Sequence, residues 1–289
     1  MPETPTSGQL ENAQRAVIGE ARYTAEHNMP VVALMEPMTL PQGAKSQVVP
    51  KVGQFDFEDL IDGIDLEDEQ AIGMTTSELT TGEIGAKIIL TDKLVRQEAE
   101  SPFKMVGRQF GSGAARKMDN DGIALFAALN GGTVLGADNK NLTIGNAGAC
   151  IAFAQANKFP GPVFVVHHPN AIYAITNSAA VTPSGTYPIP HGYSEDLLRD
   201  FYRFSFNQVE FFQDGNIAAI SGIDSGYGVI ASRQAMCNLR SKGFSVERQR
   251  DASLRATEMV ATADYGMWEL DDSYGAGMQY EIGNPSTSV

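Results

Sequence analysis

The stretch from Gln47 to Leu129 constrains the fold most, because it predicts a strongly acidic β-hairpin that leads into one long helix. Between Val52 and Ala86 the sequence has ten carboxylates and no Lys or Arg. A hairpin with this charge cannot be buried in a core of its own, since buried carboxylates need partners or must be neutralised. An isolated hairpin is also only marginally stable in water. We therefore expect it to lie against another molecule, and a second copy of the chain is the simplest partner.

The predicted hairpin occupies residues 47–93, and alternating apolar residues from Ile84 to Leu90 indicate its returning strand. Its tip has an apolar side that needs cover, which makes the tip a candidate assembly surface. The candidate residues of this assembly loop are Asp56, Glu58, Asp59, Leu60, Ile64, Leu66 and Glu67.

A long helix is predicted over residues 101–130, with Ser101 as its cap and Pro102 at its first position. Apolar or small residues recur in steps of three and four, and Gly131-Gly132 ends the pattern. The length is roughly 40 Å at about 1.5 Å per residue. The interior glycines indicate close backbone approach or a bend; two shorter helices broken near 111–113 are the alternative. The candidate packing residues are Phe103, Val106, Phe110, Gly111, Gly113, Met118 and Phe126.

The rest of the chain reads as an arm, an α/β region and late strands. Residues 1–46 form the arm, with a weak helix pattern over 11–26. Residues 141–240 alternate helices and strands. Long strands then return over 246–269, and we expect them to pair near the base of the hairpin and the long helix. The predicted helices of the α/β region cover 147–157, 170–176, 195–202 and 233–241, and its strands cover 163–166, 208–212 and 228–231.

The composition excludes several classes of function. The net charge of −14 and the pI of about 4.7 argue against a basic groove that holds nucleic acid tightly. The two cysteines, Cys150 and Cys237, are expected to be core residues in a reducing compartment. The N-terminus lacks the pattern of a signal peptide, and no apolar window reaches membrane-spanning length. We expect a soluble protein made in a cytoplasm.

The sequence does not indicate catalytic chemistry. His167 and His168 are adjacent on a predicted strand, so their side chains point to opposite faces and make a poor shared metal site. Gly111-Ser112-Gly113 lacks the Gly-Lys-Ser/Thr ending of a phosphate loop. The paired carboxylates lie in the predicted hairpin and read as a solvated face. We therefore expect no enzyme and no catalytic, cofactor-binding or metal-binding residues.

The order of these parts resembles the major capsid proteins of tailed double-stranded DNA phages, which have the Hong Kong 97-like fold. Three stretches carry the resemblance: FVVHHPNAIYAIT at 164–176, LLRDFY at 197–202 with VEFFQDGNI at 209–217, and RDASLRATEMVATADYG at 250–266. The resemblance covers about residues 15–282. It implies an α+β fold with an N-terminal arm, an extended loop, a spine helix, a peripheral domain and an axial domain.

By this resemblance, residues 1–46 are the arm and residues 47–93 the extended loop that lies over a neighbouring subunit. Residues 94–140 contain the spine helix of the peripheral domain, 141–240 form the axial domain, and 241–289 return to the peripheral domain and end in a tail. The resemblance implies self-assembly into pentamers and hexamers as an icosahedral shell that encloses double-stranded DNA without sequence-specific binding.

The same resemblance implies partners and a location. The partners are a scaffolding protein encoded separately, a portal protein at one vertex and, in some relatives, a cement or decoration protein. The location is the virion capsid, assembled in the host cytoplasm. Two rival hypotheses stay open: the shell of a bacterial cargo-holding nanocompartment, which shares the fold, and a soluble α/β enzyme with an acidic lid.

Overall fold

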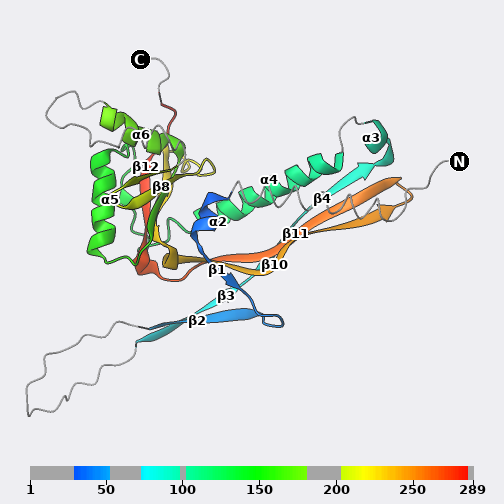
Figure 1. Ribbon diagram of the computed structural model, residues 1–289, viewed down its shortest axis with the longest axis horizontal. Coiled ribbons are helices and arrows are strands. Elements are labelled where there is room, and N and C mark those ends of the chain that lie inside the picture. Colours follow the sequence, from blue (N-terminus) through cyan, green and yellow to red (C-terminus); the bar gives the residue numbers. More distant parts are fainter. Residues whose placement is uncertain (1–28, 53–72, 98–101, 181–202, 286–289) are drawn as a thin grey trace, which may run out of the picture.

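Two β-sheets of different shape organise the chain (Figure 1). The computed structural model describes residues 29–52, 73–97, 102–180 and 203–285. A six-stranded sheet forms a compact unit, and a four-stranded sheet extends from it as a long ribbon with helix α4 (Pro102–Ile123) along one face. A two-stranded hairpin projects in the opposite direction. The expected α+β class is confirmed.

The six-stranded sheet has the order β5-β12-β9-β6-β8-β7. Its strands are β5 (Leu135–Gly136), β12 (Gly275–Glu281), β9 (Ser225–Ser232), β6 (Val163–His167), β8 (Val209–Gln213) and β7 (Arg203–Phe206). Helices α5 (Ile144–Ala156) and α6 (Pro169–Ala180) cover one face, where Ile151, Ile172 and Val165 share a core. The other face packs on α2 (Pro30–Leu34) and on the turns after α4, through residues such as Val31 and Phe126.

The ribbon has the order β1-β10-β11-β4. Its strands are β1 (Glu36–Thr39), β10 (Met236–Asp251), β11 (Ala256–Glu269) and β4 (Gly82–Thr91). β11 alternates buried and partly buried residues, as expected for a strand with one covered face. Val106 and Phe110 of α4 pack there against Val246, Met259 and Leu90. The β10–β11 pairing is irregular between residues 240 and 245, where the register shifts twice.

The pairing of β4 corrects the predicted hairpin. The alternating residues Ile84–Leu90 do lie on a strand, but that strand pairs with β11. The strand that returns in the hairpin is β3 (Met74–Thr80), which pairs with β2 (Ser46–Val52). Alternation identifies a strand with one covered face and does not identify its partner, so both arrangements fit the sequence. The predicted pairing of the late strands near the hairpin base is confirmed.

Helix α4 is single and shorter than expected. It ends at Ile123, so it is about 33 Å long at about 1.5 Å per residue, and the alternative of two helices is wrong. Tight turns follow, and Asn130, Gly131 and Gly132 take positive φ values. Phe126 and Leu129 continue the apolar spacing because they are buried against the six-stranded sheet instead of against the ribbon.

Two further expectations need correction. Residues 233–241 do not form a helix: a short 3₁₀ turn, Arg233–Ala235, leads directly into β10. The final strand β12 pairs with β9 in the six-stranded sheet, so the segment 241–289 does not all return to the ribbon. α3 (Asp92–Gln97) and the 3₁₀ turn Asp272–Tyr274 complete the described elements. The helices predicted over 11–26 and 195–202 lie outside the described residues.

Candidate assembly surfaces

The stem of the acidic hairpin is fastened to the start of the ribbon. Trp268 donates its indole N–H to the Thr80 carbonyl oxygen at 2.7 Å, and Lys51 pairs with Asp271 at 2.6 Å. Burial alone would raise the pKa of Asp271, but hydrogen bonds from Lys51 and Ser273 outweigh it and lower that pKa. The stem therefore leaves the ribbon in a direction that several contacts fix.

The seven predicted residues of the assembly loop, 56, 58–60, 64, 66 and 67, lie outside the described residues. The described stem next to them presents apolar side chains to solvent: Val48 is 57% exposed and Met74 is 58% exposed. Large apolar side chains on both strands of a projecting hairpin are consistent with a surface that a partner covers.

The predicted packing residues of the long helix divide between two cores. Val106 and Phe110 are buried on the ribbon, with Phe103 partly buried beside them. Phe126 lies beyond the helix end and is buried against the six-stranded sheet. Met118 is partly buried.

The glycines of α4 also differ from one another. Gly111 is buried, whereas Gly113 is exposed and a Cβ built there meets nothing within 4 Å. Close approach occurs instead at Gly122, where a Cβ would lie 2.9 Å from Cε of Met35 and 3.1 Å from Cγ1 of Val31. The expectation of close packing at Gly113 within the chain is therefore wrong.

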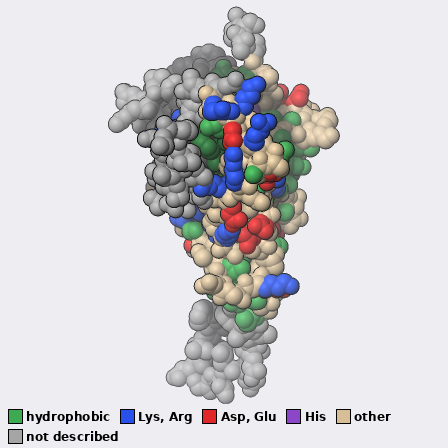
Figure 2. All heavy atoms as spheres, turned by 90° about the vertical axis from the view of Figure 1, so that its right-hand side faces the viewer, with side chains coloured by type: hydrophobic (Ala, Val, Ile, Leu, Met, Phe, Trp, Pro, Cys, Tyr) green, Lys and Arg blue, Asp and Glu red, His purple; other side chains and the backbone are tan. Residues whose placement is uncertain are grey.

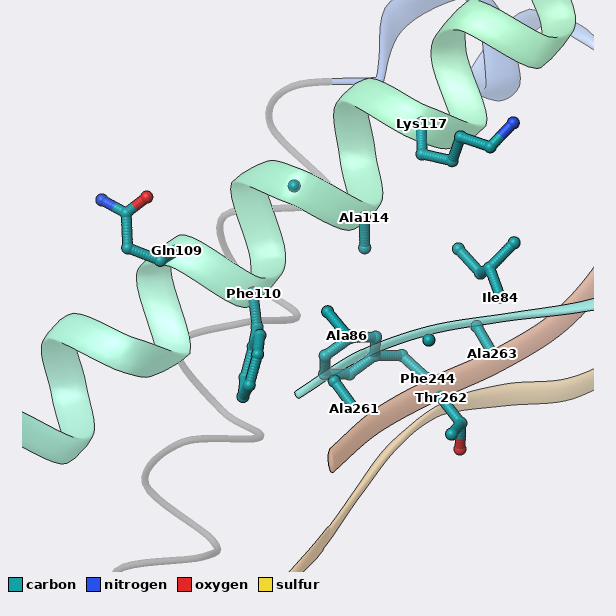
Figure 3. A pocket seen from close by; sticks show the side chains of 12 residues that line it. Ile84, Ala86, Gln109, Phe110, Ala114, Lys117, Phe244, Ala261, Thr262 and Ala263 are labelled. Atoms are coloured by element: carbon teal, nitrogen blue, oxygen red, sulfur yellow. The ribbon is translucent and has the colours of Figure 1, made fainter. Parts of the chain in front are cut away.

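An open groove runs between α4 and the ribbon (Figure 3). Its volume is about 370 Å³. Phe110 and Ala114 point from the helix toward the strands, while Gln109 points away from them. Phe244, Ala86 and Ala261 supply the facing wall, so the lining is mainly apolar. This lining suits the packing of an apolar segment and offers no converging polar groups of the kind that ligand sites use.

The far end of the ribbon is basic, which sequence reasoning missed. Figure 2 shows Lys and Arg side chains gathered on this end of the molecule. The exposed basic residues of α3, the start of α4 and the β10–β11 turn are Lys93, Arg96, Lys104, Arg250 and Arg255. They come from three separate stretches of a chain whose net charge is −14, so the overall charge conceals them.

Two acidic residues, Asp92 and Asp251, lie within this basic end, and Asp92 pairs with one of its arginines. Nη1 and Nη2 of Arg250 donate to Oδ1 and Oδ2 of Asp92, each at 2.6 Å. This two-pronged hydrogen bond, together with the charge of Arg250, lowers the pKa of Asp92. The bidentate pair fixes the orientation of Arg250 beside α3 and leaves Lys93 and Arg96 of the same helix exposed.

Within the described residues, no group of three or more His, Cys, Asp or Glu side chains could hold a metal ion. His167 is fully buried, and burial lowers its pKa to about 3, so it is neutral at physiological pH. Cys150 and Cys237 are buried free thiols. No helix of the described parts is long and apolar enough to cross a membrane.

The comparisons with known proteins match the fold and not the sequence. No protein-family model matches the chain, and no curated protein matches it. The capsid of cyanophage Pam1 superposes with a TM-score of 0.65 at 9% identity, covering 91% of this chain and 93% of the other. The capsid of cyanophage P-SCSP1u gives 0.62 at 14% identity, with 86% and 87% covered.

A shell protein of another kind matches equally well. The SrpI encapsulin of Synechococcus elongatus gives a TM-score of 0.63 at 12% identity, with 91% of this chain and 92% of the other covered. Identities this low establish the fold alone. The fold of this chain, over nearly its whole length, is the Hong Kong 97-like fold of tailed-phage capsid proteins.

Proposed function

We propose that this chain is the major capsid protein of a tailed double-stranded DNA phage and assembles as pentamers and hexamers into an icosahedral shell. The observation that carries the proposal is the projecting stem, fastened by an ion pair and a hydrogen bond at one end of a ribbon whose other end is basic. Two complementary surfaces on opposite ends of one chain favour head-to-tail contacts between copies, and such heterologous contacts form rings when the rotation between neighbours closes.

The acidic segment 53–72 is too short to reach the basic end of its own chain. The strands β2 and β3 on either side of it are paired, so a chain of twenty residues joining their ends can reach about 36 Å from them at most. The strands β3 and β4 run from the end of the segment toward the basic end, and at about 3.3 Å per residue their 18 residues, 74–91, span roughly 60 Å. The acidic segment therefore meets a basic end only on a neighbouring copy.

The distribution of charge supports the contact between the acidic segment and a neighbour's basic end, and it also supports a shell that encloses DNA. The segment 53–72 has eight carboxylates and no basic residue, which is more than half of the net charge of −14. The basic end offers Lys93, Arg96, Lys104 and Arg255 as exposed cations in addition to Arg250, which pairs with Asp92. When a neighbour's carboxylates pair with these cations, the rest of the shell is acidic and repels packaged DNA. This repulsion is compatible with a shell that encloses DNA without sequence-specific binding.

Further partners follow from the same proposal. A separate scaffolding protein guides assembly in the host cytoplasm, a portal protein replaces one pentamer, and a cement or decoration protein can cover the outer surface. The proposed structural role needs no cofactor and no catalytic residue.

A cargo-holding nanocompartment shell is the second candidate function, and the equal similarity to the SrpI encapsulin supports it. The two candidates differ in what the shell encloses. A phage shell needs a scaffold and a portal to fill with DNA, whereas a nanocompartment closes around protein without them.

The test is electron microscopy with light scattering on the purified chain, made alone and together with the scaffolding protein from its own genome. Rings of five or six subunits, or closed shells tens of nanometres across, support a shell protein. Shells that form without a scaffold and hold protein cargo favour the nanocompartment. A compact monomer under both conditions, with the acidic segment intact, contradicts assembly.

A further inference from the structure

Two buried carboxyl groups face each other where the arm, the long helix and the six-stranded sheet meet. Asp119 of α4 is 0% exposed, and Asp214, directly after β8, is 2% exposed. Their carboxyl groups lie within hydrogen-bonding reach of each other. Two ionised carboxylates cannot occupy such a site without a large penalty, because burial and mutual repulsion both oppose the second charge.

Backbone and amide donors occupy three of the four carboxyl oxygens. Val31 of α2 donates its N–H to Oδ1 of Asp119 at 3.2 Å, and the Asn216 amide donates to Oδ2 at 2.8 Å. The Asn216 N–H donates to Oδ1 of Asp214 at 2.8 Å. Oδ2 of Asp214 is buried with no hydrogen-bond partner. A proton between the two carboxyl groups satisfies this fourth oxygen.

The titratable groups near Asp119 and Asp214 are compatible with a proton between these two carboxyl groups. His168, which follows β6, is the other titratable group that interacts with Asp214, and burial lowers its own pKa. Arg116, exposed on α4, lines an adjacent polar cavity of about 330 Å³ together with Ser112 and Asp214. The described part of α2 adds only backbone at this point, since its sequence is PVVAL.

We propose that Asp119 and Asp214 share one proton at neutral pH and that this proton fastens α2 and α4 to the loop after β8. Loss of the proton places two negative charges against each other at the junction of the compact unit and the ribbon. The junction then loosens, and the arm and long helix change their position relative to the six-stranded sheet. The site couples pH to the angle between the two parts of the subunit.

The direction of the pH effect follows from the raised pKa. Burial, followed by the hydrogen bond with Asp214, raises the pKa of Asp119 from 3.8 to about 8. The folded chain therefore holds a proton that the unfolded chain releases near pH 4. The stabilisation that this group gives the folded state is complete below about pH 4. Between about pH 4 and pH 8 the folding equilibrium constant falls about tenfold per pH unit, and above about pH 8 the stabilisation is lost.

The test uses the full chain labelled with ¹³C at the aspartate side-chain carboxyl, studied by infrared spectroscopy. We expect an aspartic acid C=O band, shifted by the label, that is present at about pH 7 and disappears with a midpoint near pH 8. The label separates this band from glutamate, which is needed because burial also raises the pKa of Glu269. Absence of the band at neutral pH overturns the proposal.

The variant Asp214→Asn supplies a permanent donor in place of the shared proton. Its amide nitrogen can donate to Asp119, while its oxygen still accepts from the Asn216 N–H. We expect the pKa of Asp119 to fall toward its ordinary value, because only the contribution of burial remains; the band should then weaken at pH 7 and its midpoint should move to lower pH, and the tenfold loss per pH unit should end at that lower pH. The matched control Asp224→Asn changes an exposed aspartate before β9 and should keep both. An unchanged band or pH slope in Asp214→Asn overturns the proposal.

Amide exchange in α2 reports the loosening itself. After correction for the intrinsic pH dependence, exchange of the Val31 segment should rise about tenfold per pH unit between about pH 5 and pH 8 in the natural chain and level off above about pH 8, because opening of the junction releases the proton only below the pKa of the closed site. Asp224→Asn should behave in the same way. No rise in either chain refutes the link between proton and junction, and the infrared titration decides the proton even if Asp214→Asn does not fold. Neither measurement requires a shell, so the result is independent of the proposed function.

Discussion

Replacing Gly113 and Gly122 by Ala, one at a time, tests how α4 packs. Both residues lie inside the same helix, and both exchanges remove the same backbone freedom. They differ in surroundings: the methyl group at 113 enters open space, whereas the methyl group at 122 meets Met35 and Val31. The contribution of helix propensity to the free energy of unfolding is therefore the same in both variants, and the difference between them reports the packing at each site.

The expected magnitudes follow from this contrast. Gly→Ala inside an exposed helix stabilises by about 1 kcal/mol. For a chain of this size that raises the unfolding temperature by about 2 to 4 °C, which is the expected result for Gly113→Ala. At Gly122 an overpacking cost of about 1 to 3 kcal/mol opposes the same gain, so a net loss of about 0 to 2 kcal/mol is expected. The flexible end of Met35 places the result toward the smaller loss.

The assay is calorimetry and denaturant unfolding of dispersed subunits, followed by an assembly yield. Equal stabilisation by both exchanges would refute the contact between α2 and α4. Destabilisation by Gly113→Ala in dispersed subunits would refute the open groove. If Gly113→Ala stabilises the subunit and yet prevents assembly, a neighbouring copy packs against the groove in the shell.

Three further predictions concern the hairpin, the basic end and the thiols. Replacement of residues 53–72 by a short Gly-Ser linker should abolish shells and leave folded subunits, seen by microscopy and circular dichroism; intact shells would rule out the extended-loop assignment. Charge reversal at Lys93 and Arg255 should weaken assembly. Raising the salt concentration from about 0.1 to 1 M should also weaken assembly of the natural chain, because the Debye length falls from about 10 to 3 Å. Assembly that strengthens with salt would contradict the ionic contact. Cys150 and Cys237 should resist thiol reagents until unfolding, because burial raises the pKa of both; rapid labelling of the native chain would show that these sites open.

Regular elements could be predicted where one face of the element is covered. The strand at 84–90, the strand at 163–167 and the helix opened by Pro169 all occur, because apolar spacing reports burial directly. Partners could not be predicted in the same way. β4 belongs to the ribbon and β12 to the six-stranded sheet, and the spacing of their residues is compatible with either arrangement.

The sequence does not predict contacts between single residues that lie far apart along the chain. Asp119 and Asp214 are 95 positions apart, and no motif around either residue links it to the other. The basic end is made from three segments, and the net charge of −14 points away from it. The sequence predicts too long a helix for a related reason. Phe126 and Leu129 keep the apolar spacing of the helix, although they lie beyond its end and pack on a different sheet.

The irregular pairing of β10 with β11 between residues 240 and 245 bears on curvature. A closed surface made of identical subunits bends by different amounts at its flat faces and at its vertices. A bulge leaves a residue outside the ladder and increases local twist, so a ribbon bends there at the lowest cost. Bending confined to these few residues tilts the basic end relative to the hairpin root and leaves Val106 and Phe110 in their core. In the proposed shell, one subunit would then fit flat and curved positions by changing a short length of one strand.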